Sequence, residues 1–147
     1  MNKLILIAAL FLGYHLWQKH QNSKPNPTAA AMATTDTCAT KKLCTIVYVT
    51  PWCPACAQVS PILQAWISKT KDHPEYGIKV IVGYGRNAGD NERTAANYGV
   101  NSVVDSDLSL ANKLNIKYYP TFLLVNPAGT IIKKDQDVVK WASETIL

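Results

Sequence analysis

The sequence lacks the features that define several large classes of protein. Its four cysteines are too few for a small disulfide-held scaffold, and the lack of any uninterrupted apolar run of about 18 residues excludes a polytopic membrane bundle. Charged residues make up only 17% of the chain and apolar residues 48%, a balance that excludes wholesale disorder. A length of 147 residues then fits one ordinary domain with a sizeable core.

Basic residues are not clustered on the part of the chain expected to fold. The net charge is +5, but residues 1–43 carry five lysines against one aspartate, whereas residues 44–147 carry ten basic and nine acidic side chains. A nucleic-acid footprint needs clustered Lys and Arg on the folded domain. We therefore expect no nucleic-acid partner.

The N-terminal segment has the pattern of an export signal or a membrane anchor. Lys3 precedes a mostly apolar run over residues 4–17. As a helix, this run would span about 21 Å against a hydrocarbon core of about 30 Å, which favours a cleavable signal. The small residues that a signal peptidase needs occur much later, in triplets that end at Ala31 and Ala33. We predict an uncleaved anchor over residues 1–20, with cleavage near these alanines or a surface-lying amphipathic helix as alternatives.

The next segment predicts a flexible linker. Residues 21–42 are rich in Pro, Thr, Ala, Asn and Ser and show no apolar periodicity. Residues 43–147 are then the folded domain.

Within that domain, apolar patterning predicts alternating strands and helices of an α/β protein. The β-branched run over residues 45–50 is typical of a strand buried on both faces, and apolar spacing from Val59 onward indicates a helix. Two aromatic residues on helices, Trp66 and Trp141, are expected in the core. The predicted order is strand 45–50, helix 53–70, strand 78–82, helix 92–98, strand 103–104, a helix around 110–114 capped by Asp105 or Ser106, hairpin strands 121–125 and 130–134, and a last helix over 138–142.

Two cysteines stand at the first strand–helix junction, in the run Cys53-Pro54-Ala55-Cys56. Thiols three residues apart in a first helical turn can close a disulfide with little backbone movement. The free N–H groups and partial positive charge of a helix N-terminus favour a thiolate at Cys53, the attacking form in disulfide exchange. Cys56, one turn further in, is expected to be less exposed and to act as the resolving thiol.

This region resembles the active site of the thioredoxin superfamily. The run Trp52–Cys56 follows a β-branched strand, and Pro61 lies eight residues after Cys53, where thioredoxins kink their active-site helix. Tyr119-Pro120-Thr121 occupies the place of the family's cis-proline. The stretch over residues 105–129 is similar to the membrane-tethered TlpA/ResA-like branch. The resemblance covers residues 43–147.

The resemblance implies a thioredoxin-like fold, with a mixed central sheet flanked by helices on both faces. It also implies a protein thiol:disulfide oxidoreductase that needs no cofactor or metal. Cys53 and Cys56 would be catalytic, whereas Trp52, Tyr119 and Pro120 would contact the protein substrate, with the Tyr119 backbone pairing to an extended client segment. With the N-terminal anchor, it implies a single-pass protein of a bacterial inner membrane whose domain faces the periplasm, or a periplasmic protein if the segment is cleaved.

The chain departs from the family at two chemically important places. Val47 stands six residues before Cys53, where thioredoxins keep a buried aspartate that takes the proton of the resolving thiol. No histidine lies in the motif, because His15, His20 and His73 are all elsewhere. Without histidine to stabilise the thiolate, the chemistry favours the reductase or isomerase direction, and a membrane redox partner would supply electrons.

The second cysteine pair, Cys38 and Cys44, leaves alternatives open. A structural disulfide in an oxidising compartment is favoured over a second redox pair that exchanges electrons with Cys53 and Cys56. The four cysteines could also hold zinc, although the spacing is not a usual zinc pattern, and Cys53–Cys56 could be a static disulfide. A non-enzymatic redox-sensing or metal-handling module using the same thiols is the alternative function.

Overall fold

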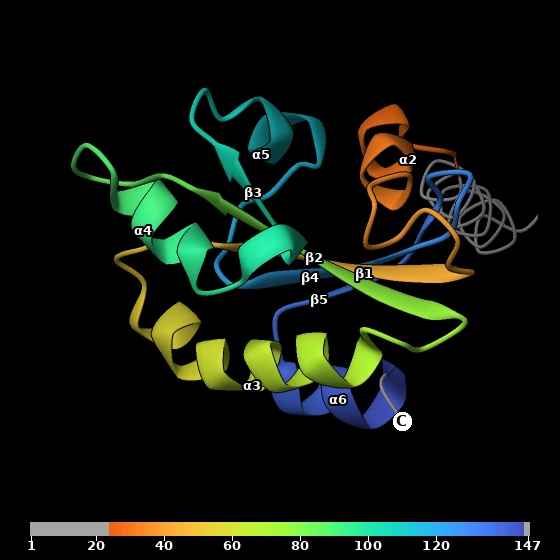
Figure 1. Cartoon of the computed structure of the whole chain (residues 1–147). Helices are drawn as coiled ribbons and strands as arrows, with labels where there is room; N and C mark the ends of the chain where they lie inside the picture. Colours follow the sequence, from red (N-terminus) through yellow and green to blue (C-terminus); the bar gives the residue numbers. More distant parts are fainter. Residues whose placement is uncertain (1–23, 146–147) are drawn as a thin grey trace, which may run out of the picture.

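The described part of the chain, residues 24–145 of this computed structural model, is built around one five-stranded sheet (Figure 1). The strand order is β3-β2-β1-β4-β5, with β1 to β3 mutually parallel and β4 antiparallel to both of its neighbours. This is the predicted mixed sheet closed by an antiparallel hairpin. The strands are β1 (Leu43–Val49), β2 (Tyr76–Gly83), β3 (Ser102–Asp105), β4 (Thr121–Val125) and β5 (Ile131–Asp135).

Strand β1 runs through the middle of the sheet and divides the core into two halves. Its residues from Cys44 to Val49 are all buried, which confirms the prediction of a strand covered on both faces. Because side chains alternate along a strand, Val47 and Val49 belong to one apolar cluster, and Ile46 and Tyr48 belong to the other.

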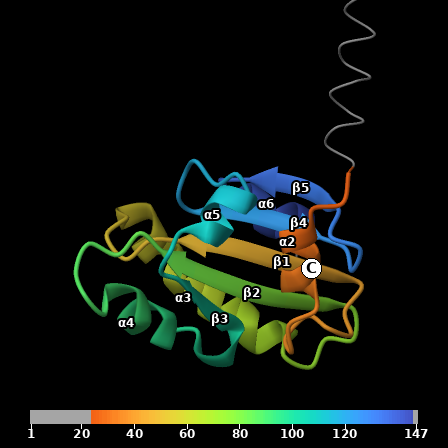
Figure 2. The ribbon, with the colours of Figure 1, turned by 90° about the horizontal axis from the view of Figure 1, so that it is seen from above.

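Helices cover both faces of the sheet (Figures 1 and 2). Two helices lie on the face that carries Val47, and Trp66 and Trp141 pack there against Phe122, as predicted. Two shorter helices lie on the opposite face, and another runs beside β2 and β3. The helices are α3 (Pro54–Thr70) and α6 (Val138–Thr145) on the first face, α2 (Pro27–Ala33) and α5 (Ser109–Lys113) on the second, and α4 (Asp90–Ala96) near β3, followed by a 3₁₀ turn, Gly99–Asn101.

The cap predicted for α5 is only partly correct. The N-cap residue is Leu108, with a φ of 60°, rather than Asp105 or Ser106. Asp105 nevertheless serves the same helix end, because its buried carboxylate accepts hydrogen bonds from the backbone N–H groups of Leu110 and Ala111 at 3.0 and 2.9 Å. The carboxylate therefore links the end of β3 to the start of α5.

The prediction of a flexible linker over residues 21–42 is wrong for the part that the structure describes. Helix α2 buries Thr28, Ala29 and Ala33 against the second face of the sheet. Asn26 caps this helix by accepting from the amides of residues 28 and 29, and its side chain donates to the Lys113 carbonyl at 3.0 Å. The segment packs through small side chains, so it shows no pattern of large apolar residues.

The predicted anchor over residues 1–20 lies outside the described residues. Within residues 24–145, no helix has both the length and the apolar character needed to cross a bilayer.

The cap of α2 provides a test of this docking. Replacing Asn26 with Ala removes the helix cap and the bond to Lys113, so we expect the free energy of unfolding to fall by about 1–2 kcal/mol. Chemical denaturation would measure this change, with Asn112→Ala, an exposed asparagine on α5, as the matched control. An Asn26→Ala protein as stable as the parent would contradict a docked helix.

Candidate active site at the end of strand β1

Cys53 is held at the N-terminus of α3 by the backbone of the helix that it begins. It is the N-cap residue, with an extended φ of −83°, and Pro54 is the first helical residue. The backbone N–H of Cys56 donates a hydrogen bond to Cys53 Sγ at 3.3 Å. A donor aimed at sulfur, in the field of the helix N-terminus, stabilises negative charge at Cys53.

Cys56 lies one turn deeper, and its environment keeps it protonated. It is 4% exposed against 8% for Cys53, so both thiols are largely covered and Cys56 slightly more so. Burial, reinforced by hydrogen bonding with Cys53, raises the pKa of Cys56 to about 12, while the backbone of Thr50 acts in the opposite direction. Cys56 is therefore a thiol at neutral pH, which is compatible with the resolving role predicted for it.

The loop before β4 brings Tyr119 and Pro120 to Cys53. The Tyr119–Pro120 peptide bond is cis, the isomer that the family resemblance implied. The Cys53 thiol donates to the Tyr119 carbonyl oxygen at 3.6 Å. The Tyr119 backbone, where the resemblance predicts that an extended client pairs, thus lies beside Cys53 Sγ.

Aromatic side chains form a wall around Cys53. Trp52 is 42% exposed, and its indole N–H donates to the Tyr84 carbonyl at 2.8 Å. Ring centroids lie 6.0 Å apart for Trp52 and Tyr119, and 5.3 Å apart for Tyr84 and Tyr119. The Tyr48 ring packs against this wall, with its centroid 5.9 Å from that of Tyr119. Tyr118 is mostly exposed.

Sequence reasoning missed two residues here, the aromatic Tyr84 and the neighbouring Arg86. Tyr84 follows β2 in a left-handed conformation, with a φ of 58°, and Arg86 places its guanidinium 4.5 Å from the centre of the Trp52 ring. Tyr84 lies in the run Gly83-Tyr84-Gly85, and such closely spaced glycines are the one local signal that marks this loop.

In the part of the chain that the structure describes, no carboxylate near Cys56 replaces the missing aspartate. Val47 is fully buried at that position. The buried carboxylate of Asp105 accepts from the Tyr48 hydroxyl at 2.8 Å as well as from the start of α5. Since Tyr48 belongs to the opposite face of the sheet from Cys56, Asp105 does not serve this thiol.

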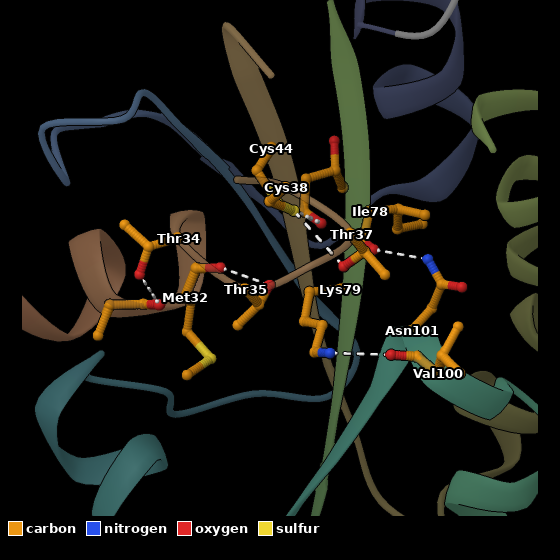
Figure 3. The surroundings of a disulfide bond; sticks show 12 residues. Met32, Thr34, Thr35, Thr37, Cys38, Cys44, Ile78, Lys79, Val100 and Asn101 are labelled. Atoms are coloured by element: carbon orange, nitrogen blue, oxygen red, sulfur yellow. Dashed lines mark hydrogen bonds between the residues drawn. A yellow bond between two sulfur atoms is a disulfide. The ribbon is translucent and has the colours of Figure 1, made fainter. Parts of the chain in front are cut away.

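The other two cysteines form a disulfide, shown in Figure 3. Cys38 and Cys44 are bonded to each other, with 5.7 Å between their Cα atoms, and both are buried in the cluster opposite Cys53 and Cys56. The four-cysteine zinc site is therefore wrong, because these two sulfurs are joined. Within residues 24–145, no group of three or more potential ligands is placed to hold a metal ion.

The disulfide fastens the segment after α2 to the beginning of β1. Gly77 of β2 makes room for it, because a Cβ there would lie 2.4 Å from the Thr37 carbonyl oxygen and 3.1 Å from Cys38 Sγ. Cys44 lies near the first residue of β1, whereas Cys53 follows its last, so roughly 20 Å of strand separates the two pairs. Direct attack between the pairs is not possible at that separation, which favours a structural role.

Comparisons with known proteins agree with this geometry. Residues 41–131 match the family model described as "Thioredoxin-like". The chain belongs to the thioredoxin-like family. No curated protein sequence matches it.

Solved structures share the thioredoxin-like fold. A secreted Mycobacterium tuberculosis disulfide oxidoreductase, homologous to E. coli DsbE, is 20% identical, with a TM-score of 0.54 over 67% of this chain and 72% of that one. StoA from Bacillus subtilis is 21% identical, with a TM-score of 0.53 over 66% and 75%. A thiol-disulfide oxidoreductase from Bacteroides fragilis is 15% identical, with a TM-score of 0.60 over 76% and 86%.

A double substitution tests the role of the second pair. Replacing Cys38 and Cys44 with Ser should lower the free energy of unfolding by about 2 kcal/mol, the entropy of closing so small a ring, and leave disulfide exchange intact. Denaturation and an insulin-reduction assay on the same preparation would measure both effects. Loss of exchange at unchanged stability would instead favour a redox relay.

Proposed function

We propose that this chain is an enzyme that exchanges disulfides with protein substrates through Cys53 and Cys56. The observation that carries the proposal is the position of Cys53 Sγ, which receives the Cys56 amide at 3.3 Å and faces the Tyr119 carbonyl at 3.6 Å. One sulfur thus has a donor that favours the attacking thiolate and a neighbouring backbone on which a client can lie. The general redox function agrees with the thioredoxin-like family.

In the reducing direction, the reaction takes two exchanges. The Cys53 thiolate attacks one sulfur of a client disulfide, forms a mixed disulfide and releases the other client sulfur as a thiolate. Cys56 then loses its proton and attacks Cys53 Sγ. The Cys53–client bond breaks, the Cys53–Cys56 disulfide forms, and the two electrons remain on the client, whose thiolates take protons from solvent.

The client is proposed to bind as an extended segment beside Tyr119. Backbone pairing next to Cys53 is a form of strand addition, with affinity from main-chain hydrogen bonds. Trp52 and Tyr84 lie on one side of the proposed client position, and Pro120 fixes the Tyr119 backbone on the other side. Such a surface recognises main chain and an apolar flank around the client cysteine.

The compartment and the direction are part of the proposal. The Cys38–Cys44 disulfide supports an oxidising, extracytoplasmic location, because such bonds persist outside the cytosol. The secreted M. tuberculosis neighbour is consistent with it. We place the protein in the TlpA/ResA-like branch, tethered to a bacterial inner membrane with its domain in the periplasm. It would act as a reductase or isomerase recharged by a membrane redox partner.

Trapping of mixed disulfides tests the assigned roles. Cys56→Ala should accumulate mixed disulfides with client proteins, which an added reductant releases, because the first exchange proceeds and the second cannot. Cys53→Ala should accumulate none and should fail to reduce insulin. Non-reducing gels of whole extracts, followed by mass spectrometry, would show the adducts. The Cys53→Ala/Cys56→Ala protein serves as the background control, and adducts on Cys53→Ala alone would reverse the assignment.

A further inference from the structure

A cleft of about 270 Å³ opens beside Cys56, between the beginning of α3 and the end of α4. Its polar lining is made of hydroxyl and amide groups, including those of Thr50, Ser60 and Tyr98, and none of the residues that line it is a carboxylate or a cation. The Tyr98 hydroxyl donates to Ser60 Oγ at 3.0 Å. The buried thiol therefore borders a polar opening to solvent.

Thr50 stands out in this cleft because its hydroxyl is buried without a partner. The residue is 2% exposed, and Thr50 Oγ1 makes no hydrogen bond to any residue from 24 to 145. A buried hydroxyl without a partner destabilises a fold, so packing alone does not account for Thr50 at this position. Thr50 and Cys56 line the same cleft, close enough that the Thr50 backbone, and to a smaller extent its side chain, lowers the pKa of Cys56 against the larger effect of burial.

The groups that face Cys56 are otherwise neutral. The titratable ones are Cys53 at the start of α3, Tyr98 after α4 and Tyr119 before β4. Burial, followed by a smaller effect of Cys56, raises the pKa of Tyr98. Burial, together with Tyr84 and Cys56, raises the pKa of Tyr119 to about 12. Among residues 24–145, a thiolate at Cys56 thus has no carboxylate to take its proton and no cation to balance its charge.

We propose that Thr50 is the positioning residue for the second exchange, in place of the missing buried acid. Its hydroxyl donates a hydrogen bond to Cys56 Sγ as the thiolate forms, and the proton of Cys56 passes to solvent through the cleft lined by Ser60 and Tyr98. The thiolate then attacks Cys53 Sγ and expels the client sulfur. This inference rests on the proposed function, because it concerns the step that follows the mixed disulfide.

The second step should depend on pH because Cys56 attacks as a thiolate. Burial, the largest cause of the raised pKa of Cys56, acts in the mixed disulfide as well, so the thiolate fraction rises between pH 6 and 9. Release from the mixed disulfide should therefore become faster with pH over this range. A variant without the Thr50 hydroxyl should keep this rise but lie lower at every pH.

Reduced protein and 5,5′-dithiobis(2-nitrobenzoate) separate the two steps in one stopped-flow experiment. Attack by Cys53 releases one nitrothiobenzoate, and attack by Cys56 on the mixed disulfide releases a second. Thr50→Val keeps the shape of the side chain but removes the donor, so we expect the second phase to slow about tenfold while the first is unchanged. Thr50→Ser should restore the parent rate.

Matched controls separate this role from packing. Thr70→Val removes a buried hydroxyl at the far end of α3, whose partner is the Trp66 carbonyl at 2.8 Å, and should leave both phases unchanged. Because Thr50 Oγ1 lacks a partner, Thr50→Val should not lower the midpoint of thermal unfolding.

Three results would overturn the assignment of Thr50. They are a second phase in Thr50→Val within twofold of the parent, a Thr50→Ser protein as slow as Thr50→Val, or equal slowing of both phases. A first phase that persists in Cys53→Ala would instead overturn the proposed function.

Discussion

The hydrogen bond from the Cys56 amide to Cys53 Sγ is the interaction on which the site depends. It exists because a buried parallel strand, β1, ends beside the first turn of α3, and because Cys53 rather than Ser or Asp is the N-cap residue. The same bond caps the helix and orients the sulfur. One contact thus both stabilises the start of α3 and positions Cys53 Sγ.

The two thiols differ in their depth in the fold and in the groups around them. Both thiols belong to the same apolar cluster, but Cys53 lies at the helix end beside Tyr119, whereas Cys56 lies one turn further in and has its pKa raised by burial. A pair with equal environments would have no preferred order of attack. In the proposed reaction the order of attack follows from depth, and the polar cleft at Thr50 would give the deeper thiol a way to lose its proton.

The parts of the fold that local patterns determine were predictable, and those that depend on distant contacts were not. Strand β1 and helix α3 follow from β-branched and amphipathic runs, and the expected motif chemistry falls at their junction. Helix α2 was missed because its buried residues are Ala and Thr, which carry no periodic signal. Its docking depends on Asn26, whose partners lie near residue 113 and in the turn at Gly129.

The candidate site shows the same division. Cys53, Cys56 and the Tyr119–Pro120 bond were identified from the motif and the family resemblance. Tyr84 and Arg86 could not be, because they reach Trp52 from the loop after β2 through the backbone geometry of Tyr84. Thr50 follows the buried strand β1, and the role proposed for it could be inferred only once Val47, Tyr98 and Cys56 are placed together.

The reduction potential of the Cys53–Cys56 couple tests the central claim most directly. Strong oxidants have a stabilised reduced form, whereas here burial disfavours a thiolate at Cys56 and no histidine among residues 24–145 lies in the motif. His73, the one histidine among residues 24–145, lies at the opposite end of the sheet, where it accepts from the amides of Glu75 and Tyr76. Equilibration in dithiothreitol redox buffers, with alkylation and peptide mapping, should give a reversible two-electron couple at about −270 mV, as in thioredoxin. A value of about −120 mV would contradict the reducing direction. The absence of a reversible couple at these two cysteines would contradict the account as a whole.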